Sequence, residues 1–293
     1  MKRRIIPLLV LCVIGSLLLS FSVQAAVTHR GGVTPDNLPW NRNPSRQVTY
    51  DFSTVNTKET STTGTALAKL ALVIGISDYS GTSSDLNYCD DDAYEVYNTL
   101  VNVYGFPSNN IVLLIDSDAT DANIRAGIDW LISNSGPDSI VVFAYSGHGS
   151  RSNTDVDGDG ERADECIIPW ELSRIWDGEL ANLFSQLTSN KVWISFDSCY
   201  AGGMNDPGIT GPGKVVTMAC AENELSYESS SIQNGYYTYL MVELGMRQGK
   251  ADANADGIVT VEEAFTYCKN EMPKYNRRQK PQMSDGVSGD LQL

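Results

Sequence analysis

Two apolar runs that end in chemically active residues constrain this chain more than any other feature. The run Ser139–Tyr145 is rich in β-branched and aromatic residues, and Val192–Phe196 has the same character. Such runs are typical of strands that are buried on both faces of a parallel sheet. The first run is followed by His148 between two glycines, and the second by Cys199 before a glycine-rich turn. Open α/β sheets carry their reactive groups at the carboxyl ends of strands, so we expect these two side chains to meet there.

The rest of the chain indicates an α/β fold. Strand-like runs alternate with segments of helical spacing, in an order that gives a parallel sheet with right-handed crossovers. The predicted strands are Leu70–Ile76, Asn110–Ile115, Ser139–Tyr145, Cys166–Ile168, Val192–Phe196 and Val215–Cys220. The predicted helices are Asp90–Tyr104, Asp121–Ser133, Glu179–Leu187, Tyr236–Met246 and Val261–Met272. We therefore predict a mostly parallel central sheet of about six strands with helices on both faces.

The N-terminus has the composition of a secretory signal peptide. Met1–Arg4 is basic, Ile5–Phe21 is almost wholly apolar, and small residues precede a cleavage point near Ala25 or Ala26. An uncleaved membrane anchor is the alternative. We expect an exported protein (extracellular, periplasmic or in the cell envelope) without stable membrane insertion after cleavage. The predicted segments are a signal peptide at 1–26, a polar arm or pro-segment at 27–69 and a folded domain at 70–293.

The chain is strongly acidic, with a formal net charge of −15, and cleavage of the signal would remove three of its cations. Such a surface repels nucleic acid and anionic lipid, and it favours cations or basic peptides as partners. The chain has six cysteines, and Cys12 would leave with the signal. An odd number then remains, so at least one thiol is unpaired. In an exported protein a leftover thiol is a candidate reactive group.

His148 and Cys199 form a candidate catalytic dyad. A thiolate attacks carbonyl carbon readily, and an imidazole can take the thiol proton and later protonate the leaving amine. The chain has two histidines, and His29 lies in the polar arm with no strand to fix it. The backbone N–H groups of Gly149 and Cys199 are candidates to hold the oxyanion. For Cys199 alone, the alternative is an inert core cysteine.

These motifs resemble those of a known family. Tyr145–Gly149 (YSGHG) and Asp197–Gly202 (DSCYAG) are similar to the catalytic motifs of caspase-like cysteine peptidases, and especially of metacaspases. The resemblance covers most of the mature chain. It implies a caspase-haemoglobinase-like fold, with His148 as the histidine of the dyad and Cys199 as the nucleophile. Metacaspases are often monomers, so we also expect a monomer.

The resemblance also predicts the residues that bind the substrate. Metacaspases line the pocket for the residue before the scissile bond with acids, in a pattern similar to Cys89, Asp92, Ser146 and Asp197. A pair of carboxylates would receive a guanidinium or ammonium group through charge-assisted hydrogen bonds. Asp92 also suits the start of a helix, and both roles can hold at once. No arginine occurs in Ser77–Asp92, where a caspase would carry one to bind aspartate. We expect cleavage of proteins or peptides after Arg or Lys.

Two acidic loops are candidates for binding Ca²⁺. The loop 252–263 fits the EF-hand pattern at every ligand position, and an Asx-rich turn is the alternative. Its expected ligands are Asp252, Asn254, Asp256, Ile258, Thr260 and Glu263. The second loop follows the histidine, where many metacaspases bind an activating calcium ion, but its match is loose and a solvated acidic loop is the alternative. Its candidate ligands are Asp155, Asp157, Asp159, Asp164 and Glu165.

Together these features predict an exported, calcium-dependent cysteine endopeptidase. A legumain-like peptidase that cleaves after Asn would share the dyad and the fold, but the acids of the predicted pocket argue against it. A calcium-stabilised binding module on an inactive peptidase scaffold is the alternative from another functional class. The intact pair of histidine and cysteine argues against that alternative.

Overall fold

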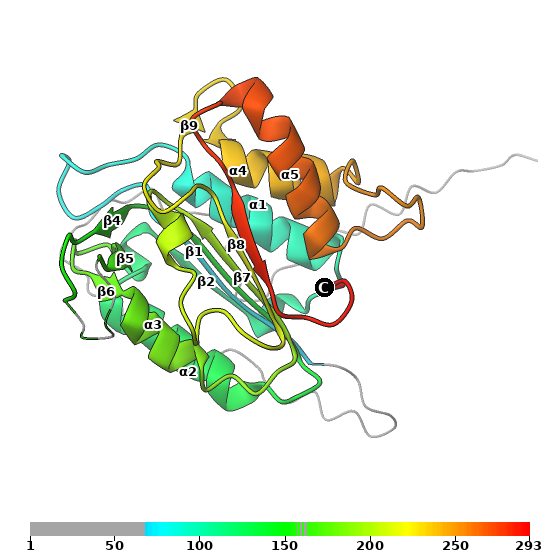
Figure 1. The fold of residues 1–293 in the computed structure, drawn as a ribbon, viewed down its shortest axis with the longest axis horizontal. Helices are drawn as coiled ribbons and strands as arrows, with labels where there is room; N and C mark the ends of the chain where they lie inside the picture. Colours follow the sequence, from blue (N-terminus) through cyan, green and yellow to red (C-terminus); the bar gives the residue numbers. More distant parts are fainter. Residues whose placement is uncertain (1–67, 157, 159, 161–162) are drawn as a thin grey trace, which may run out of the picture. The chain divides into compact units, whose positions relative to one another are not determined.

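The computed structural model describes residues 68–293, apart from positions 157, 159, 161 and 162 (Figure 1). The predicted signal peptide and nearly all of the predicted arm therefore lie outside the described residues. The strands are β1 (Lys69–Gly75), β2 (Ile111–Ile115), β3 (Ile140–Ser146), β4 (Gly149–Arg151), β5 (Glu165–Ile167), β6 (Ile175–Trp176), β7 (Lys191–Asp197), β8 (Lys214–Met218), β9 (Glu228–Ser229), β10 (Asn234–Gly235) and β11 (Gln282–Asp285). The helices are α1 (Cys89–Asn102), α2 (Asp121–Asn134), α3 (Asp177–Phe184), α4 (Tyr236–Thr238), the π-helix η6 (Tyr239–Arg247) and α5 (Val261–Tyr275), with 3-10 turns η3 (Ser108–Asn110), η4 (Asp116–Asp118) and η5 (Ala201–Gly203).

A six-stranded sheet forms the centre of the fold, in the order β11-β8-β7-β3-β1-β2 (Figure 1). The strands from β8 to β2 pair in parallel, and β11 joins the edge next to β8 in antiparallel orientation. The predicted mostly parallel sheet with helices on both faces is therefore confirmed. The predicted strand Cys166–Ile168 does not belong to it, because β5 pairs antiparallel with β4 and β6 in a separate sheet. The sequence pattern did not indicate β11, because three of its four residues are polar and the single apolar residue, Met283, gives no alternation.

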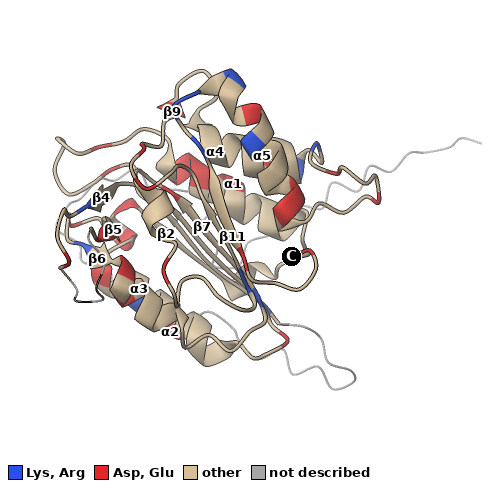
Figure 2. Cartoon of the chain, viewed as in Figure 1, with Lys and Arg blue, Asp and Glu red and all other residues tan. Residues whose placement is uncertain are grey.

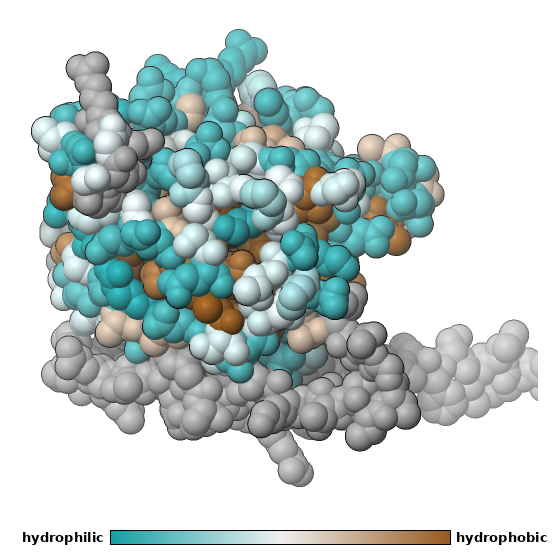
Figure 3. Space-filling view, turned by 60° about the horizontal axis from the view of Figure 1, so that its bottom comes forward, coloured by the Kyte–Doolittle hydropathy of each residue, from teal (hydrophilic) through white to brown (hydrophobic). Residues whose placement is uncertain are grey.

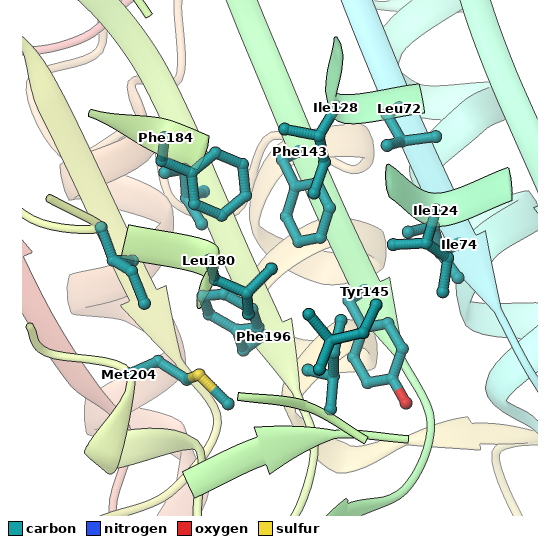
Figure 4. Packing of buried hydrophobic residues seen from close by; sticks show 14 of the residues in the cluster. Leu72, Ile74, Ile124, Ile128, Phe143, Tyr145, Leu180, Phe184, Phe196 and Met204 are labelled. Carbon is teal, nitrogen blue, oxygen red and sulfur yellow. The ribbon is translucent and has the colours of Figure 1, made fainter. Parts of the chain in front are cut away.

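Each face of the sheet carries its own apolar core. On one face, α2 and α3 cover Phe143 and Phe196 of the sheet, and Phe184 packs against them (Figure 4). The ring centre of Phe143 lies 5.0 Å from that of Phe184 and 5.7 Å from that of Phe196. On the other face, α1, η6 and α5 pack over Ala71 and Trp193. Because both faces are covered, the central strands are continuous apolar runs in the sequence.

The predicted helices form, with one difference in type. Tyr236–Met246, expected as one helix, is a short α-helix followed by the wider turns of η6. The backbone bond from Gln248 N–H to Glu243 O shows the five-residue spacing. The apolar pattern could not distinguish the two helix types, because either one buries Leu240, Met241 and Leu244 against its neighbours.

The surface of the described part is largely polar. In Figure 2 acidic segments outnumber basic ones, and several lie around β5, β6 and α3. The face in Figure 3 is mainly hydrophilic, and its apolar residues form small separate groups. Within residues 68–293 as described, we find no helix with the length and apolar content to cross a bilayer.

Removing the central aromatic ring of the core should destabilise the fold. Phe143 is 0% exposed, so Phe143→Ala leaves a cavity, and we expect it to lower the free energy of unfolding by about 3–5 kcal/mol. Urea unfolding followed by circular dichroism measures the change. Val103→Ala is the control, because Val103 is 46% exposed and should change the free energy by less than about 0.5 kcal/mol. Equal effects of the two substitutions would contradict the central place of Phe143 in the core.

Candidate active site

The register of β3 with β7 places the predicted dyad at the carboxyl ends of these two central strands. Ser146 pairs with Asp197 in this parallel ladder, and His148 and Cys199 each follow two residues later. The two turns touch, because a Cβ built on Gly149 would lie only 2.0 Å from the Cys199 carbonyl oxygen. The structure therefore brings the three predicted catalytic residues together.

Cys199 occupies a tight turn between β7 and η5. The next residue, Tyr200, has a φ of +62°, and such left-handed backbone is uncommon for residues with side chains and concentrates at functional sites. The Tyr200 N–H donates to the Glu224 carbonyl oxygen at 2.9 Å, which fixes the turn. The Cys199 thiol donates to the Ser226 carbonyl oxygen at 3.8 Å. Burial, together with the charge of Asp197, raises the pKa of the Cys199 thiol, so this thiol needs a base to become a nucleophile.

The tautomer of His148 follows from its contacts. Its Nε2 atom lies 2.7 Å from the carbonyl oxygen of Ser84. A carbonyl oxygen only accepts hydrogen bonds, so Nε2 carries the proton in the neutral imidazole. Nδ1 is then the nitrogen with a free lone pair, and it is the atom that can accept a proton from a thiol.

The four predicted substrate-binding residues also lie together, close to the dyad. Asp92 accepts hydrogen bonds from Ser146 Oγ at 2.7 Å and from Gly235 N–H at 2.8 Å. Asp197 accepts from Ser226 Oγ at 2.6 Å and from the Thr238 hydroxyl at 2.8 Å. The same carboxylates and Ser146 act on the buried thiol of Cys89, whose pKa is raised first by burial and then by the charge of Asp92.

The two carboxyl groups share one narrow space. A Cβ built on Gly235 would lie 2.6 Å from an oxygen of Asp197 and 2.9 Å from an oxygen of Asp92. A cavity of about 10 Å³ adjoins both carboxyl groups, which is room for about one water molecule. Burial raises the pKa of Asp92, and the charge of Asp197 raises it further. Burial likewise raises the pKa of Asp197. Two buried like charges this close favour a state in which the pair holds a proton.

Comparison with known families agrees with this geometry. A family model described as "Caspase domain" matches residues 68–292, which is more than half of the chain. The chain belongs to the caspase family. Among solved structures it is similar to a crystal structure of the protein GSU0716 from Geobacter sulfurreducens, with 17% identity and a TM-score of 0.57, over 77% of this chain and 97% of the other. At this identity the likeness supports the fold alone.

The relatives in sequence are metacaspases. Metacaspase-4 of Arabidopsis thaliana is 34% identical over 181 residues, which cover 59% of this chain and 43% of the relative. Metacaspase-7 of the same plant is 35% identical over 48% of this chain and 36% of its own length. Metacaspase-1 of Saccharomyces cerevisiae is 34% identical over 46% of this chain and 34% of its own length. The chain thus spans less than half the length of these relatives. Its resemblance to caspase-like cysteine peptidases of the metacaspase type is confirmed.

The loop 252–263 has a local geometry compatible with a calcium loop. Asp252 accepts hydrogen bonds from Asp256 N–H at 3.2 Å and from Gly257 N–H at 3.0 Å, and Gly257 has a φ of +84°. Asn254 Oδ1 accepts from Asp256 N–H at 2.8 Å. The carboxylate of Glu263 instead accepts from Thr260 N–H at 3.1 Å and caps α5. Oxygen ligands of the right type are therefore present, although in the described part of the chain no three His, Cys, Asp or Glu side chains converge on a metal position.

The acidic loop after the histidine lies close to the turn that follows Cys199, because a Cβ built on Gly203 would lie 2.1 Å from the Glu165 carboxylate. Asp164 and Glu165 are each 1% exposed, and Asp155 accepts from Gly158 N–H at 2.6 Å. Positions 157 and 159, also predicted as ligands, lie outside the described residues. Glu165 lines a cavity of about 560 Å³ with Asp206, Glu222 and the turn residues Gly202 and Gly203. Asp206 was not among the predicted ligands, and no pattern in the sequence places it at this cavity.

The cysteines and several polar partners complete the site. All five cysteines of the described part are free thiols, in agreement with the expected unpaired cysteine. Sequence reasoning also missed several groups that hold the dyad and the pocket. These are Tyr79, Ser84, Ser226, Gly235 and Thr238. A backbone N–H, a backbone carbonyl or a loop hydroxyl carries no pattern in a sequence, so the sequence offered no signal for these groups.

Neutralising one buried acid should stabilise the protein. The raised pKa of Asp92 means that its stabilising contribution is present below the ordinary aspartate pKa of about 4 and is lost as pH rises through the raised value. Asparagine cannot ionise, so Asp92→Asn removes this loss of stability. Folding strengthens proton binding by the Asp92 carboxyl group, and each tenfold increase in proton affinity corresponds to a loss of about 1.4 kcal/mol. We expect a higher melting temperature than that of the wild type at pH 7 and no difference near pH 3. A variant that is less stable at pH 7 would show that the ionised pair stabilises the fold.

Proposed function

We propose that this protein is an exported cysteine endopeptidase that cleaves after Arg or Lys and depends on calcium. The observation that carries the proposal is the pair of buried carboxyl groups, Asp92 and Asp197, beside the turn that holds Cys199. A cation is the substrate group that such a pair binds best, because it cancels charge that the fold leaves uncompensated.

In the proposed reaction, Cys199 is the nucleophile and His148 is the general base. Nδ1 of His148 takes the thiol proton, and Sγ then attacks the carbonyl carbon of the scissile peptide bond. The N–H groups of Gly149 and Cys199 stabilise the oxyanion that forms. The imidazolium returns its proton to the leaving amine, which gives a thioester. Water then attacks the thioester with the same imidazole as base and releases the second product.

The acid pair sets the preference for the residue before the scissile bond. At rest the two carboxyl groups accept hydrogen bonds from protein groups and favour a shared proton. A bound guanidinium or ammonium group favours the fully ionised pair, so recognition includes release of that proton. A neutral Asn side chain gives no such compensation, and an Asp side chain would add a third negative charge.

Calcium has two proposed positions in this chain. The loop 252–263 would hold it with the side chains of Asp252, Asn254, Asp256 and Glu263. The loop after the histidine would hold it with Asp164 and Glu165, and Asp206 lines the same cavity as Glu165 beside the turn that holds Cys199. When bound, the ion supplies positive charge that neutralises neighbouring carboxylates and orders the loop that carries them. Without the ion, the carboxylate of Glu165 already packs against the turn after Cys199, because a Cβ built on Gly203 would lie 2.1 Å from it.

The first test is hydrolysis of fluorogenic peptides that end in Arg, Lys, Asn or Asp, with calcium or with a chelator. We expect calcium-dependent release after Arg and Lys, and loss of at least about 10³-fold in Cys199→Ala, because the covalent step is removed. Asp197→Asn should lower kcat/KM for the Arg peptide about 100-fold, since only one of the two carboxylates would then be left to bind the substrate cation. Release after Asn or Asp would agree with the proposed dyad but contradict the proposed cation-binding pocket. No release from any peptide would favour a binding module on an inactive peptidase scaffold.

Calcium binding can be assigned to the two loops by calorimetry. We expect the double variant Asp252→Asn/Glu263→Gln to lose one bound ion, because two of its charged ligands become neutral. Asp206→Asn should weaken activation by calcium about tenfold or more while retaining the first ion. Lys269→Gln, on the exposed side of α5, is the control and should behave as the wild type. Unchanged calcium stoichiometry in both loop variants would contradict the proposal.

A further inference from the structure

Two buried tyrosines hold the backbone of His148. The His148 N–H donates to the Tyr79 hydroxyl at 2.7 Å, and the Tyr145 hydroxyl donates to the His148 carbonyl oxygen at 2.8 Å. Tyr79 follows β1 and Tyr145 lies on β3, the neighbouring strand. Each tyrosine is 2% exposed. The β3 ladder ends at Ser146, so the two phenols take the place of ladder bonds for a residue that lies beyond the sheet.

The side chain of Tyr79 also contacts the imidazole itself. The two ring centres lie 4.7 Å apart, with planes inclined by 38°. The Ser84 carbonyl oxygen holds the Nε2 atom of the same imidazole at 2.7 Å. One face and one nitrogen of the His148 ring are therefore fixed, and Nδ1 is left for proton transfer.

The space at Gly147 belongs to the same arrangement. A Cβ built there would lie 2.7 Å from the Tyr145 hydroxyl oxygen and 2.8 Å from the Tyr79 hydroxyl oxygen. Any side chain at this position would displace both phenols, so the glycine before the histidine is explained by the tyrosines. Burial raises the pKa of the Tyr79 phenol, which keeps it protonated and able to donate to the Ile168 carbonyl oxygen at 3.3 Å.

We propose that Tyr79 is a positioning residue for proton transfer: it sets where the His148 imidazole stands relative to the Cys199 thiol. This inference rests on the proposed role of His148 as the base of the dyad. Proton transfer requires heavy atoms within hydrogen-bond reach, and a misplacement of about 1 Å can cost about 100-fold in rate. The carboxylates of the substrate pocket have hydrogen-bond donors on other segments. Loss of Tyr79 should therefore affect kcat and leave KM nearly unchanged.

The test compares Tyr79→Phe with Tyr79→Leu in the full chain. The first variant keeps the ring against the imidazole and loses the hydroxyl, whereas the second loses both contacts. One readout is the rate at which iodoacetamide alkylates Cys199, followed by mass spectrometry, because it needs no substrate. The other readout is kcat and KM on an Arg peptide. We expect Tyr79→Leu to lower the alkylation rate and kcat by about 10–100-fold with KM within about twofold. Tyr79→Phe should lower them by only about 3–10-fold.

Ser189→Ala is the control at the amino ends of β3 and β7, away from the dyad. The Ser189 hydroxyl is also buried and donates to a backbone carbonyl, that of Ser139, at 2.5 Å. This variant should lower the melting temperature as Tyr79→Phe does while keeping wild-type rates. If both Tyr79 variants match Ser189→Ala in both readouts, the positioning role is overturned although the dyad stands. If His148→Ala is alkylated as fast as the wild type, the dyad itself fails, and the role of Tyr79 fails with it.

Discussion

The parallel pairing of β3 with β7 is the constraint on which the rest of the site depends. Its register sets Ser146 beside Asp197, and the residues two positions later, His148 and Cys199, leave the sheet at the same height. A slip by one residue would turn every side chain of one strand to the opposite face. The apolar cores on both faces oppose that slip, because the apolar side chains of both strands already pack against one core or the other. The positions of His148 and Cys199 therefore depend on the burial of the two strands that precede them.

The same burial explains what the sequence could reveal of the fold. The runs that became β1, β3 and β7 are covered on both faces, so their composition alone indicated strands. The edge strand Gln282–Asp285 pairs through its backbone on one side only, and its single apolar side chain, Met283, gives no periodic signal. The helical spacing of 236–246 indicated a buried helix, but the choice between α and π turns depends on hydrogen bonds that side-chain patterns do not encode.

Prediction of the site had a similar limit. Cys199 and His148 could be found because their side chains have few other uses at strand ends beside glycines. The acid pair was predicted from the resemblance to metacaspases, since Asp92 alone also suits the start of a helix. The groups that contact them are Tyr79, Ser84 and Ser226. The Tyr79 hydroxyl accepts from the backbone N–H of His148, the Ser84 carbonyl oxygen holds the imidazole, and the Ser226 hydroxyl donates to Asp197. Tyrosine and serine occur at many positions of this chain, so no spacing distinguishes these three from the rest. The predicted catalytic residues could therefore be identified in the sequence, whereas the groups that hold them could be identified only in the folded structure.

Burial of Asp92 and Asp197 gives a physical reason for the proposed selection of a cation. Asp92 and Asp197 accept hydrogen bonds from the protein itself, including those from the N–H groups of Gly235 and Thr238. The remaining destabilisation is the repulsion between two charges removed from water, and a shared proton relieves it. In the proposed function, a substrate cation would relieve the same repulsion by replacing that proton. A neutral side chain would not bring this gain, so the proposed preference for a cation rests on the electrostatic state of the acid pair.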